Sequence, residues 1–216
     1  MNCLIIAATP IEIAPFIRAL QKGAVTSKKW EVDVLITGIG LLATSYTLQK
    51  QLQLKRPDLI IQAGVGGCFK KEFPLGKVVL IKKETIADQS VIELNALKTL
   101  FDLQLVPANQ FPYKKGWLEN NNPLLKRVRL PKVKGISVNE ITTDKKKVRF
   151  YQEQFNPIIE SMEGAALHYI GLQEKIPFLQ IRSCSNYIAE RNKKNWNMKD
   201  AIQQLNVELL KLVAAL

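Results

Sequence analysis

The sequence predicts an α/β fold: a three-layer αβα sandwich around a mixed, largely parallel central sheet. Short apolar runs alternate along the chain with longer amphipathic stretches, which is the pattern of a sheet covered by helices on both faces. The 216 residues contain no internal repeat and no low-complexity linker, and this length suits one compact α/β unit. We therefore expect a single domain spanning residues 1–216.

The expected strands are short apolar runs bounded by polar or turn-forming residues. They cover residues 4–8, 32–36, 59–63, 78–81, 158–162 and 177–182. The first run has no basic segment before it and soon meets Pro10, so it predicts a buried strand rather than a signal peptide. No run reaches the roughly 18 apolar residues that a membrane span needs, and we expect no membrane partner.

Three amphipathic helices are expected between and after these strands, over residues 40–54, 163–174 and 199–215. Each repeats apolar residues three or four positions apart, so that they share one helix face. The expected inner faces contain Leu41, Ser45, Leu48 and Leu52, then Ala166, Ile170 and Gln173, then Ile202, Leu205, Leu209 and Leu212 or Val213. Asn197, with Asp200 three residues later, is expected to cap the third helix.

The composition excludes several classes of protein. Apolar residues make up 47% and charged residues 23% of the chain, which is ordinary for a folded globular protein and wrong for a disordered one. The chain has three widely spaced cysteines and one histidine, His168, which makes a structural zinc site implausible and favours a reducing, cytoplasmic location. We expect no metal and no organic cofactor.

The net charge of +12 permits an acidic partner. Nine basic residues fall within positions 126–149, which leaves a nucleic-acid-binding protein as a non-enzyme alternative. Only Phe150 and Tyr151, at the edge of that segment, supply the aromatic rings on which single-stranded bases stack. We therefore interpret the segment as a solvated surface and expect no nucleic-acid partner.

Glycine-rich turns follow two of the expected strands, at residues 37–40 (Thr-Gly-Ile-Gly) and 64–67 (Gly-Val-Gly-Gly). Glycine lets the backbone approach a ligand closely and lets N–H groups converge on oxygen atoms. Neither turn continues into Gly-Lys-Ser/Thr, and no acidic residue completes a dinucleotide fingerprint. The alternative is that both are simply tight strand-to-helix turns.

Polar side chains follow two later strands. Glu163 comes directly before a helix, where its carboxylate would either cap the helix or accept hydrogen bonds from substrate hydroxyls. Asn186 follows the run at 177–182, and its amide can both donate to and accept from the edge of a heterocycle. An asparagine is also common in turns for backbone reasons, so spacing alone leaves its role open.

Five segments, taken in order, resemble the purine nucleoside phosphorylase and nucleosidase superfamily. They are residues 7–12 (AATPIE), 37–40 (TGIG), 63–67 (AGVGG), 161–166 (SMEGAA) and 177–186 (PFLQIRSCSN). The resemblance covers residues 1 to about 215, and within the superfamily it is greatest to the futalosine hydrolases. It implies a homo-oligomer, a dimer or an assembly of dimers.

The resemblance implies hydrolysis rather than phosphorolysis. Bacterial phosphorylases of this superfamily hold phosphate with an arginine and a serine, and Gln62 and Val65 stand in those places here. A phosphate dianion prefers cationic, multidentate donors, which these two side chains do not provide. Glu12 matches the glutamate with which the nucleosidases activate water, and a carboxylate within reach of that water is a competent general base.

The ribose and the base are assigned by the same resemblance. Glu163 matches the glutamate that binds the ribose hydroxyls, with Met162 beneath the sugar, and a carboxylate there favours the oxocarbenium-like transition state. Asn186 replaces the aspartate of the adenine-specific nucleosidases, which favours a 6-oxopurine such as hypoxanthine, and Ser185 would orient its amide. In this reading the catalytic residues are Glu12, Glu163 and Asn186.

Two loops complete the implied site: a covering loop at residues 135–142 and a basic loop at residues 186–196. Ile141 aligns with the aromatic residue that stacks on the base, so apolar contact replaces stacking, and backbone groups at Ile141 and Thr142 are expected to read the base edge. Residues 186–196 resemble a loop of futalosine hydrolases, in which Arg191 would meet the benzoate carboxylate of futalosine or fix the loop. The alternative is a solvated basic loop without a ligand. The other expected substrate-binding residues are Thr37, Gly38, Gly40, Gly64 and Gly66.

The implied reaction is hydrolysis of the N-glycosidic bond of futalosine, which releases hypoxanthine and dehypoxanthine futalosine in menaquinone biosynthesis. Hydrolysis of methylthioadenosine or S-adenosylhomocysteine is the first alternative, with Asn186 as the residue that speaks against it, and hydrolysis of another purine nucleoside is also left open. A purine phosphorylase is a more distant alternative, because Gln62 and Val65 disfavour phosphate.

Overall fold

A computed structural model describes residues 1–23, 29–189 and 196–216. Within these residues, nine strands form one sheet. They are β1 (Asn2–Ala7), β2 (Glu31–Ile36), β3 (Leu59–Cys68), β4 (Val78–Glu84), β7 (Tyr113–Lys114), β8 (Trp117–Glu119), β9 (Lys132–Ser137), β10 (Ile159–Ser161) and β11 (Phe178–Tyr187). A separate hairpin pairs β5 (Ser90–Glu93) with β6 (Ala96–Thr99).

The sheet is mixed, with parallel pairs at its centre. Strands β2, β1, β3 and β11 lie side by side in parallel, and β4 pairs with β11 in the antiparallel sense. Strand β9 runs parallel to β4, and β10 runs parallel to β9. Because Glu160 of β10 also pairs with Gly67 at the end of β3, strands β3, β11, β4, β9 and β10 form a closed circuit.

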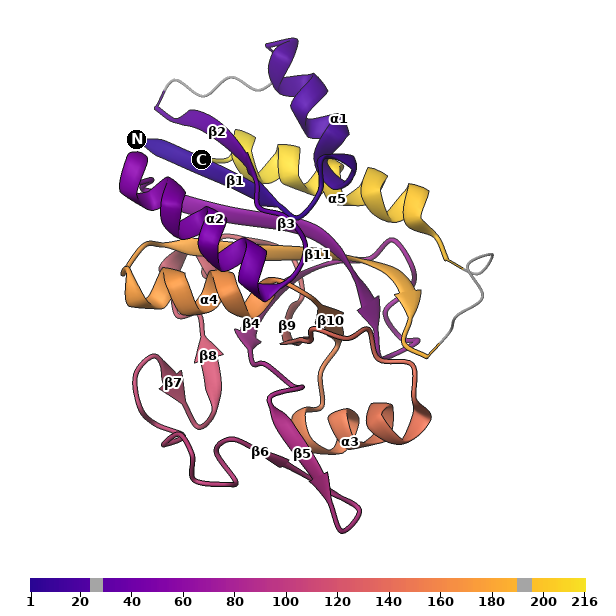
Figure 1. Cartoon of the computed structure of the whole chain (residues 1–216). Helices are drawn as coiled ribbons and strands as arrows, with labels where there is room; N and C mark the ends of the chain where they lie inside the picture. Colours follow the sequence, from indigo (N-terminus) through magenta and orange to yellow (C-terminus); the bar gives the residue numbers. More distant parts are fainter. Residues whose placement is uncertain (24–28, 190–195) are drawn as a thin grey trace.

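Helices cover both faces of the sheet, which confirms the predicted three-layer sandwich (Figure 1). Helices α1 (Pro10–Gln21) and α5 (Met198–Ala214) lie on one face, and α2 (Leu41–Leu54) and α4 (Gly164–Gln173) lie on the other. Helix α3 (Lys145–Phe155) packs beside the β5–β6 hairpin, and a short 3-10 helix, η1, covers Pro123–Lys126. No helix among the described residues is long and apolar enough to span a membrane.

The central strands are buried on both faces, and their side chains alternate between two cores. In β1, Cys3 and Ile5 pack toward α1 and α5, whereas Leu4 and Ile6 pack toward α2 and α4. This alternation follows from the two-residue repeat of a strand. It explains why β1 is apolar from Cys3 to Ala7, as expected for a parallel strand inside an α/β protein.

Most predicted elements are present, with corrections at two of the helix faces. Leu48 and Leu52 of α2 are buried, but Thr44 rather than Ser45 shares their inner face. Gln173 of α4 is exposed, because the helix end lies at the surface. Asn197 is the N-cap of α5 as predicted, although its side chain donates to the Asp200 carboxylate instead of capping the backbone.

The strand predicted at 177–182 continues to Tyr187. Its extension places Asn186 inside β11, paired with Gly67 of β3, rather than in a turn. Since β3 also lengthens to Cys68, the glycine-rich segment 64–67 belongs to a strand and not to a strand-to-helix turn. Gly66 and Asn186 of the candidate site are therefore strand residues.

Candidate active site

A pocket of about 370 Å³ lies where β1, β3, β10 and β11 end. Seven predicted site residues line it: Glu12, Gly66, Ile141, Met162, Glu163, Ser185 and Asn186. Its apolar lining includes Ile11, Ile188 and Met198. The structure thus brings together the predicted catalytic residues from segments far apart in the chain.

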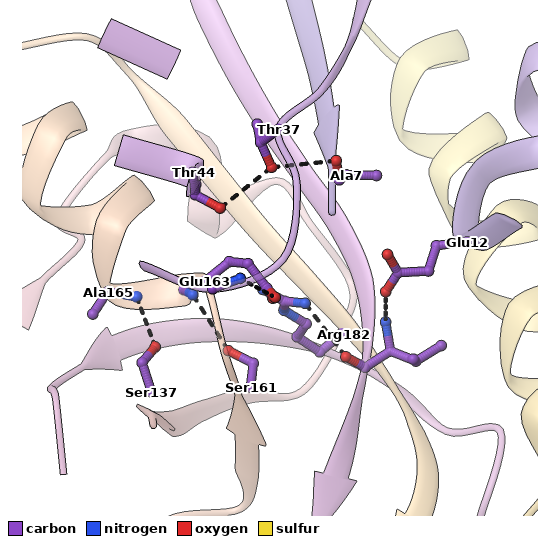
Figure 2. Close-up of polar contacts among 12 residues, drawn as sticks. Ala7, Glu12, Thr37, Thr44, Ser137, Ser161, Glu163, Ala165 and Arg182 are labelled. Atoms are coloured by element: carbon purple, nitrogen blue, oxygen red, sulfur yellow. Dashed lines mark hydrogen bonds and ion pairs between the residues drawn. The ribbon is translucent and has the colours of Figure 1, made fainter. Parts of the chain in front are cut away.

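Glu12 is held at the start of α1 by the local sequence. Thr9 occupies the N-cap position and Pro10 the first helical position, so Glu12 falls at the third, where a glutamate can reach back to the cap. Its Oε2 accepts the backbone N–H of Thr9 at 3.0 Å and the Thr9 hydroxyl at 3.1 Å. Its Oε1 accepts the N–H of Val65 at 3.0 Å (Figure 2), so this carboxylate joins α1 to the end of β3.

Glu163 is the N-cap residue of α4, yet its side chain does not cap that helix. The first free N–H groups of α4 bond instead to the hydroxyls of Ser161 and Ser137, at 3.3 and 2.8 Å. This arrangement frees the Glu163 carboxylate, whose Oε1 accepts the N–H of Gly40 at 3.2 Å. The helix-capping alternative is therefore wrong for this side chain.

Arg182, to which the sequence analysis assigns no role, links Glu163 to the segment of β3 whose N–H holds Glu12. Its Nη2 lies 3.2 Å from Oε2 of Glu163, and its Nη1 donates to the carbonyl of Val65 at 3.3 Å (Figure 2). A side chain at position 64 would collide with this guanidinium, because a Cβ there would lie 2.3 Å from Nη1. Gly64 thus lets Arg182 approach β3, and an arginine within an apolar strand was the available signal for such a partner.

Asn186 is oriented by its neighbour, as expected. The Ser185 hydroxyl lies 2.9 Å from Oδ1 of Asn186 and 3.1 Å from the carbonyl of Gly66, and its single proton serves one of them at a time. The Asn186 Nδ2 donates to the Tyr187 carbonyl at 3.2 Å. An amide Nδ2 carries two protons, so one remains for a ligand in the pocket.

The covering loop is tied down by a carboxylate that the sequence left unassigned. Ile141 is 46% exposed at the pocket, while Thr142 is buried. The Thr142 N–H donates to Oε1 of Glu160 at 3.0 Å. Since this N–H is already engaged, it is the Glu160 side chain that lines the pocket at this point.

The turn between β2 and α2 is bonded to the end of β1 and to Glu163. The Thr37 hydroxyl lies within hydrogen-bond distance of the Ala7 carbonyl and of the Thr44 hydroxyl, both at 3.3 Å (Figure 2). Gly38 and Gly40 have φ of 84° and 91°, which glycine adopts without strain. Thr37, Gly38, Gly40, Gly64 and Thr142 are not among the residues that line the pocket. Arg191 lies outside the described residues.

A buried polar cluster lies beneath α4, next to Arg182. Burial raises the pKa of Glu84 to about 8, although Arg182 opposes the rise. Burial also lowers the pKa of His168 to about 4, and its Nδ1 lies 3.0 Å from the carbonyl of Leu118. His168 is thus a packed core residue, as expected. Gly164 makes room for the cluster, because a Cβ there would lie 2.3 Å from Nε2 of Gln180 and 2.5 Å from Oε2 of Glu84.

Across residues 1–23, 29–189 and 196–216, no group of three or more His, Cys, Asp or Glu side chains is placed to hold a metal ion. The pocket is lined by three carboxylates (Glu12, Glu160 and Glu163), an oriented amide and apolar side chains, and the buried Arg182 guanidinium pairs with Glu163. Such a site can bind a polar heterocycle, stabilise positive charge on a ligand and accept a proton from water.

Fold and site together define an α/β enzyme of the nucleoside phosphorylase type. The chain belongs to the phosphorylase superfamily, whose family model matches residues 4–216. This confirms the predicted superfamily.

Relatives of low sequence identity are named as two kinds of enzyme. The methylthioadenosine/S-adenosylhomocysteine nucleosidase of Maridesulfovibrio salexigens is 26% identical over 173 residues, covering 74% of this chain and 70% of the relative. The futalosine hydrolase of Streptomyces coelicolor is 24% identical over 196 residues, covering 85% and 79%. The solved structure of futalosine hydrolase from Helicobacter pylori has a TM-score of 0.80 at 17% identity, covering 100% of this chain and 98% of that one.

Proposed function

We propose that this chain is a nucleosidase that hydrolyses the N-glycosidic bond of futalosine and releases hypoxanthine and dehypoxanthine futalosine, a step of menaquinone biosynthesis. The observation that carries the proposal is the convergence of Glu12, Glu163 and Asn186 on one pocket. Its relatives that are named nucleosidase or hydrolase support hydrolytic chemistry.

In the proposed mechanism, Glu12 accepts the proton of the attacking water. Its carboxylate is fixed by the N–H of Thr9 and the N–H of Val65, so it has little freedom to turn away from the pocket. A positioned carboxylate base of this kind contributes about 10²- to 10⁴-fold to the rate. Glu163 binds the ribose hydroxyls and favours the positive charge that develops on the sugar carbon.

The leaving base is received by Asn186. With Oδ1 held by Ser185, the free Nδ2 proton faces a ring nitrogen or carbonyl oxygen of the purine. An amide cannot deliver a proton, so the base departs as an anion stabilised by hydrogen bonds. A 6-oxopurine suits that departure, which is why we favour hypoxanthine over adenine.

Phosphate is not the proposed nucleophile. Gln62, at the place of the phosphate-binding arginine of the phosphorylases, is 1% exposed and uncharged, and Val65 is apolar. Arg182 is committed to Glu163 and to the Val65 carbonyl. Arg18 is exposed and does not line the pocket.

Methylthioadenosine/S-adenosylhomocysteine nucleosidase is the second candidate. The apolar side chains that line the pocket, among them Ile11, Ile188 and Met198, would accommodate an alkylthio group as well as an aromatic ring. Asn186 is the feature that sets the two candidates apart. Base release from futalosine and from methylthioadenosine separates them directly.

For the 5′ substituent, we propose that Arg191 contacts the futalosine benzoate carboxylate. Arginine binds carboxylates through two parallel N–H donors, so its loss should raise the KM for futalosine while leaving inosine unaffected. Unchanged efficiency of Arg191→Ala on futalosine would remove this role.

We also propose a homo-oligomer built from dimers. Leu42 and Tyr46 are 85% and 69% exposed and lie four residues apart on one face of α2, and Ile39, just before the helix, is 61% exposed. Light scattering tests the mass, and Leu42→Glu should shift it toward the monomer.

We propose a cytoplasmic location with a nucleoside, and no nucleic acid, as partner; the free thiols of Cys3, Cys68 and Cys184 agree with a reducing compartment.

A further inference from the structure

Glu160 lies in the pocket, and the mechanism above does not use it. It is the middle residue of β10, is 5% exposed and lines the pocket beside the covering loop. Its Oε1 accepts the Thr142 N–H, while its buried Oε2 has no hydrogen-bond partner among the described residues. A buried carboxylate oxygen without a donor is costly, so a ligand that supplies an N–H would relieve that cost.

The register of the sheet places Glu160 across from Asn186. Glu160 of β10 and Asn186 of β11 both pair with Gly67, from opposite sides of β3. Two strand spacings separate their backbones by about 10 Å. Both side chains line the same pocket, so a flat heterocycle between them would meet Asn186 at one edge and Glu160 at the other.

The two side chains offer opposite hydrogen-bonding groups. Asn186 presents an N–H donor, whereas an ionised Glu160 can only accept. Burial raises the pKa of Glu160 and the Asp88 carboxylate adds to the rise, whereas the hydroxyl and the N–H of Thr142 and the Lys147 ammonium oppose it. Lys147 also lies 3.8 Å from Glu140, so the covering loop and α3 keep a cation near this side of the pocket.

We propose that Glu160 determines base specificity by accepting the N1–H of a 6-oxopurine opposite Asn186. A 6-oxopurine in its lactam form carries a proton on N1, whereas N1 of a 6-aminopurine is a bare lone pair. With a 6-aminopurine, the N1 lone pair would face the Glu160 carboxylate, which would then receive no hydrogen bond from N1. Glu160 therefore favours binding of a 6-oxopurine and disfavours binding of a 6-aminopurine. The inference rests on the proposed function and names the base that the site takes.

The alternative role for Glu160 is purely structural, as the anchor of the covering loop through Thr142. Glu160→Gln separates the two roles, because the amide oxygen still accepts the Thr142 N–H while its NH₂ turns a donor toward the base. Steady-state hydrolysis is measured with inosine and adenosine, which share an unsubstituted ribose and differ at positions 1 and 6 of the base. Calorimetric binding of free hypoxanthine and adenine gives a second readout that does not need turnover.

The inosine-to-adenosine ratio of kcat/KM, and the hypoxanthine-to-adenine ratio of affinities, should fall on the order of 100-fold in Glu160→Gln. Glu140→Gln is the matched control, since it removes an exposed carboxylate from the same loop and should leave both ratios unchanged. A parallel loss for both bases in Glu160→Gln would overturn the proposal in favour of loop anchoring. If Glu160→Gln does not fold, Glu160→Ala tests the same point, because it removes the hydrogen-bond acceptor. Unchanged base ratios in Glu160→Ala would also overturn the proposal.

Failure of the inference can be distinguished from failure of the proposed function. Wild-type enzyme that releases no base from any nucleoside contradicts the proposed function, and the binding ratio of the free bases still tests Glu160. Wild-type enzyme that releases hypoxanthine, with ratios that Glu160→Gln does not alter, overturns the inference alone.

Discussion

Arg182 and Glu163 form an ion pair inside the molecule, with Nη2 and Oε2 3.2 Å apart and side chains 2% and 6% exposed. The same guanidinium donates to the carbonyl of Val65, and the N–H of Val65 donates to Glu12. The two carboxylates proposed for water activation and ribose binding are therefore positioned through one cation and one residue of β3 (Figure 2).

Removing Arg182 should destabilise the fold as well as the site. Arg182→Met leaves Glu163 buried without its partner, which costs about 3–5 kcal/mol of the free energy of unfolding. Lys55→Met is the control, because the Lys55–Asp33 pair is 42% and 34% exposed and its loss should cost about 1 kcal/mol or less. Urea unfolding measures the free energy of unfolding of both variants. Equal losses would mean that the buried Arg182–Glu163 pair stabilises the fold no more than the exposed Lys55–Asp33 pair.

Glu12→Gln should lose most of kcat while still binding hypoxanthine. The amide cannot take a proton from water, so we expect kcat to fall about 10²- to 10⁴-fold. Thr9→Val is the control, since it removes only the hydroxyl that donates to Oε2 at 3.1 Å and keeps the base. Near-normal turnover by Glu12→Gln in a single-turnover assay would remove its assignment as the general base.

Asn186→Asp should move the enzyme toward 6-aminopurines. A protonated aspartate donates to N7 and assists departure of adenine, whereas the variant loses the amide donor that suits a 6-oxopurine. The Ser185 hydroxyl can still donate to the aspartate oxygen that takes the place of Asn186 Oδ1. We expect adenosine hydrolysis to rise relative to inosine hydrolysis, measured as the ratio of kcat/KM. An unchanged ratio would show that Asn186 does not choose the base.

Glu84 should make stability depend on pH. Its folded pKa of about 8 lies above the ordinary value of 4.5, so its stabilising contribution is complete below about pH 4.5 and is lost as the pH rises toward 8. Relative to Glu84→Gln, the free energy of unfolding of the wild type should fall by up to about 1.4 kcal/mol per pH unit in this window. Urea titrations at pH 5, 6, 7 and 8 measure the difference, and a flat difference would mean that Glu84 is already ionised in the folded state.

The strongest sequence signals were the buried parallel strands. Strand β1 is apolar at every position that faces either core, and Leu48 and Leu52 mark the inner face of α2, so these elements could be predicted. No helix or strand is predicted between β5 and α3, because most strands there are short and α3 is dominated by charge. Helix α3 is fixed by tertiary contacts of Phe150, Tyr151 and Phe155 and by the Asp144 cap at Lys147.

The candidate site was predictable where residues follow strands, as with Glu12, Glu163 and Asn186. Arg182 and Glu160 were missed because their meaning depends on which strands become neighbours. The closure of β10 onto β3 places Glu160 opposite Gly67, and no local pattern in the sequence contains that pairing. The roles of the predicted site residues stay predictions until the variants above are measured.

The most direct test of the proposed function is base release from futalosine, inosine, methylthioadenosine and adenosine, in phosphate-free buffer and again with phosphate. We predict hypoxanthine from futalosine without phosphate, at a rate that added phosphate does not raise. Adenine from methylthioadenosine, with futalosine untouched, would contradict the proposal and assign the chain to the other nucleosidase group.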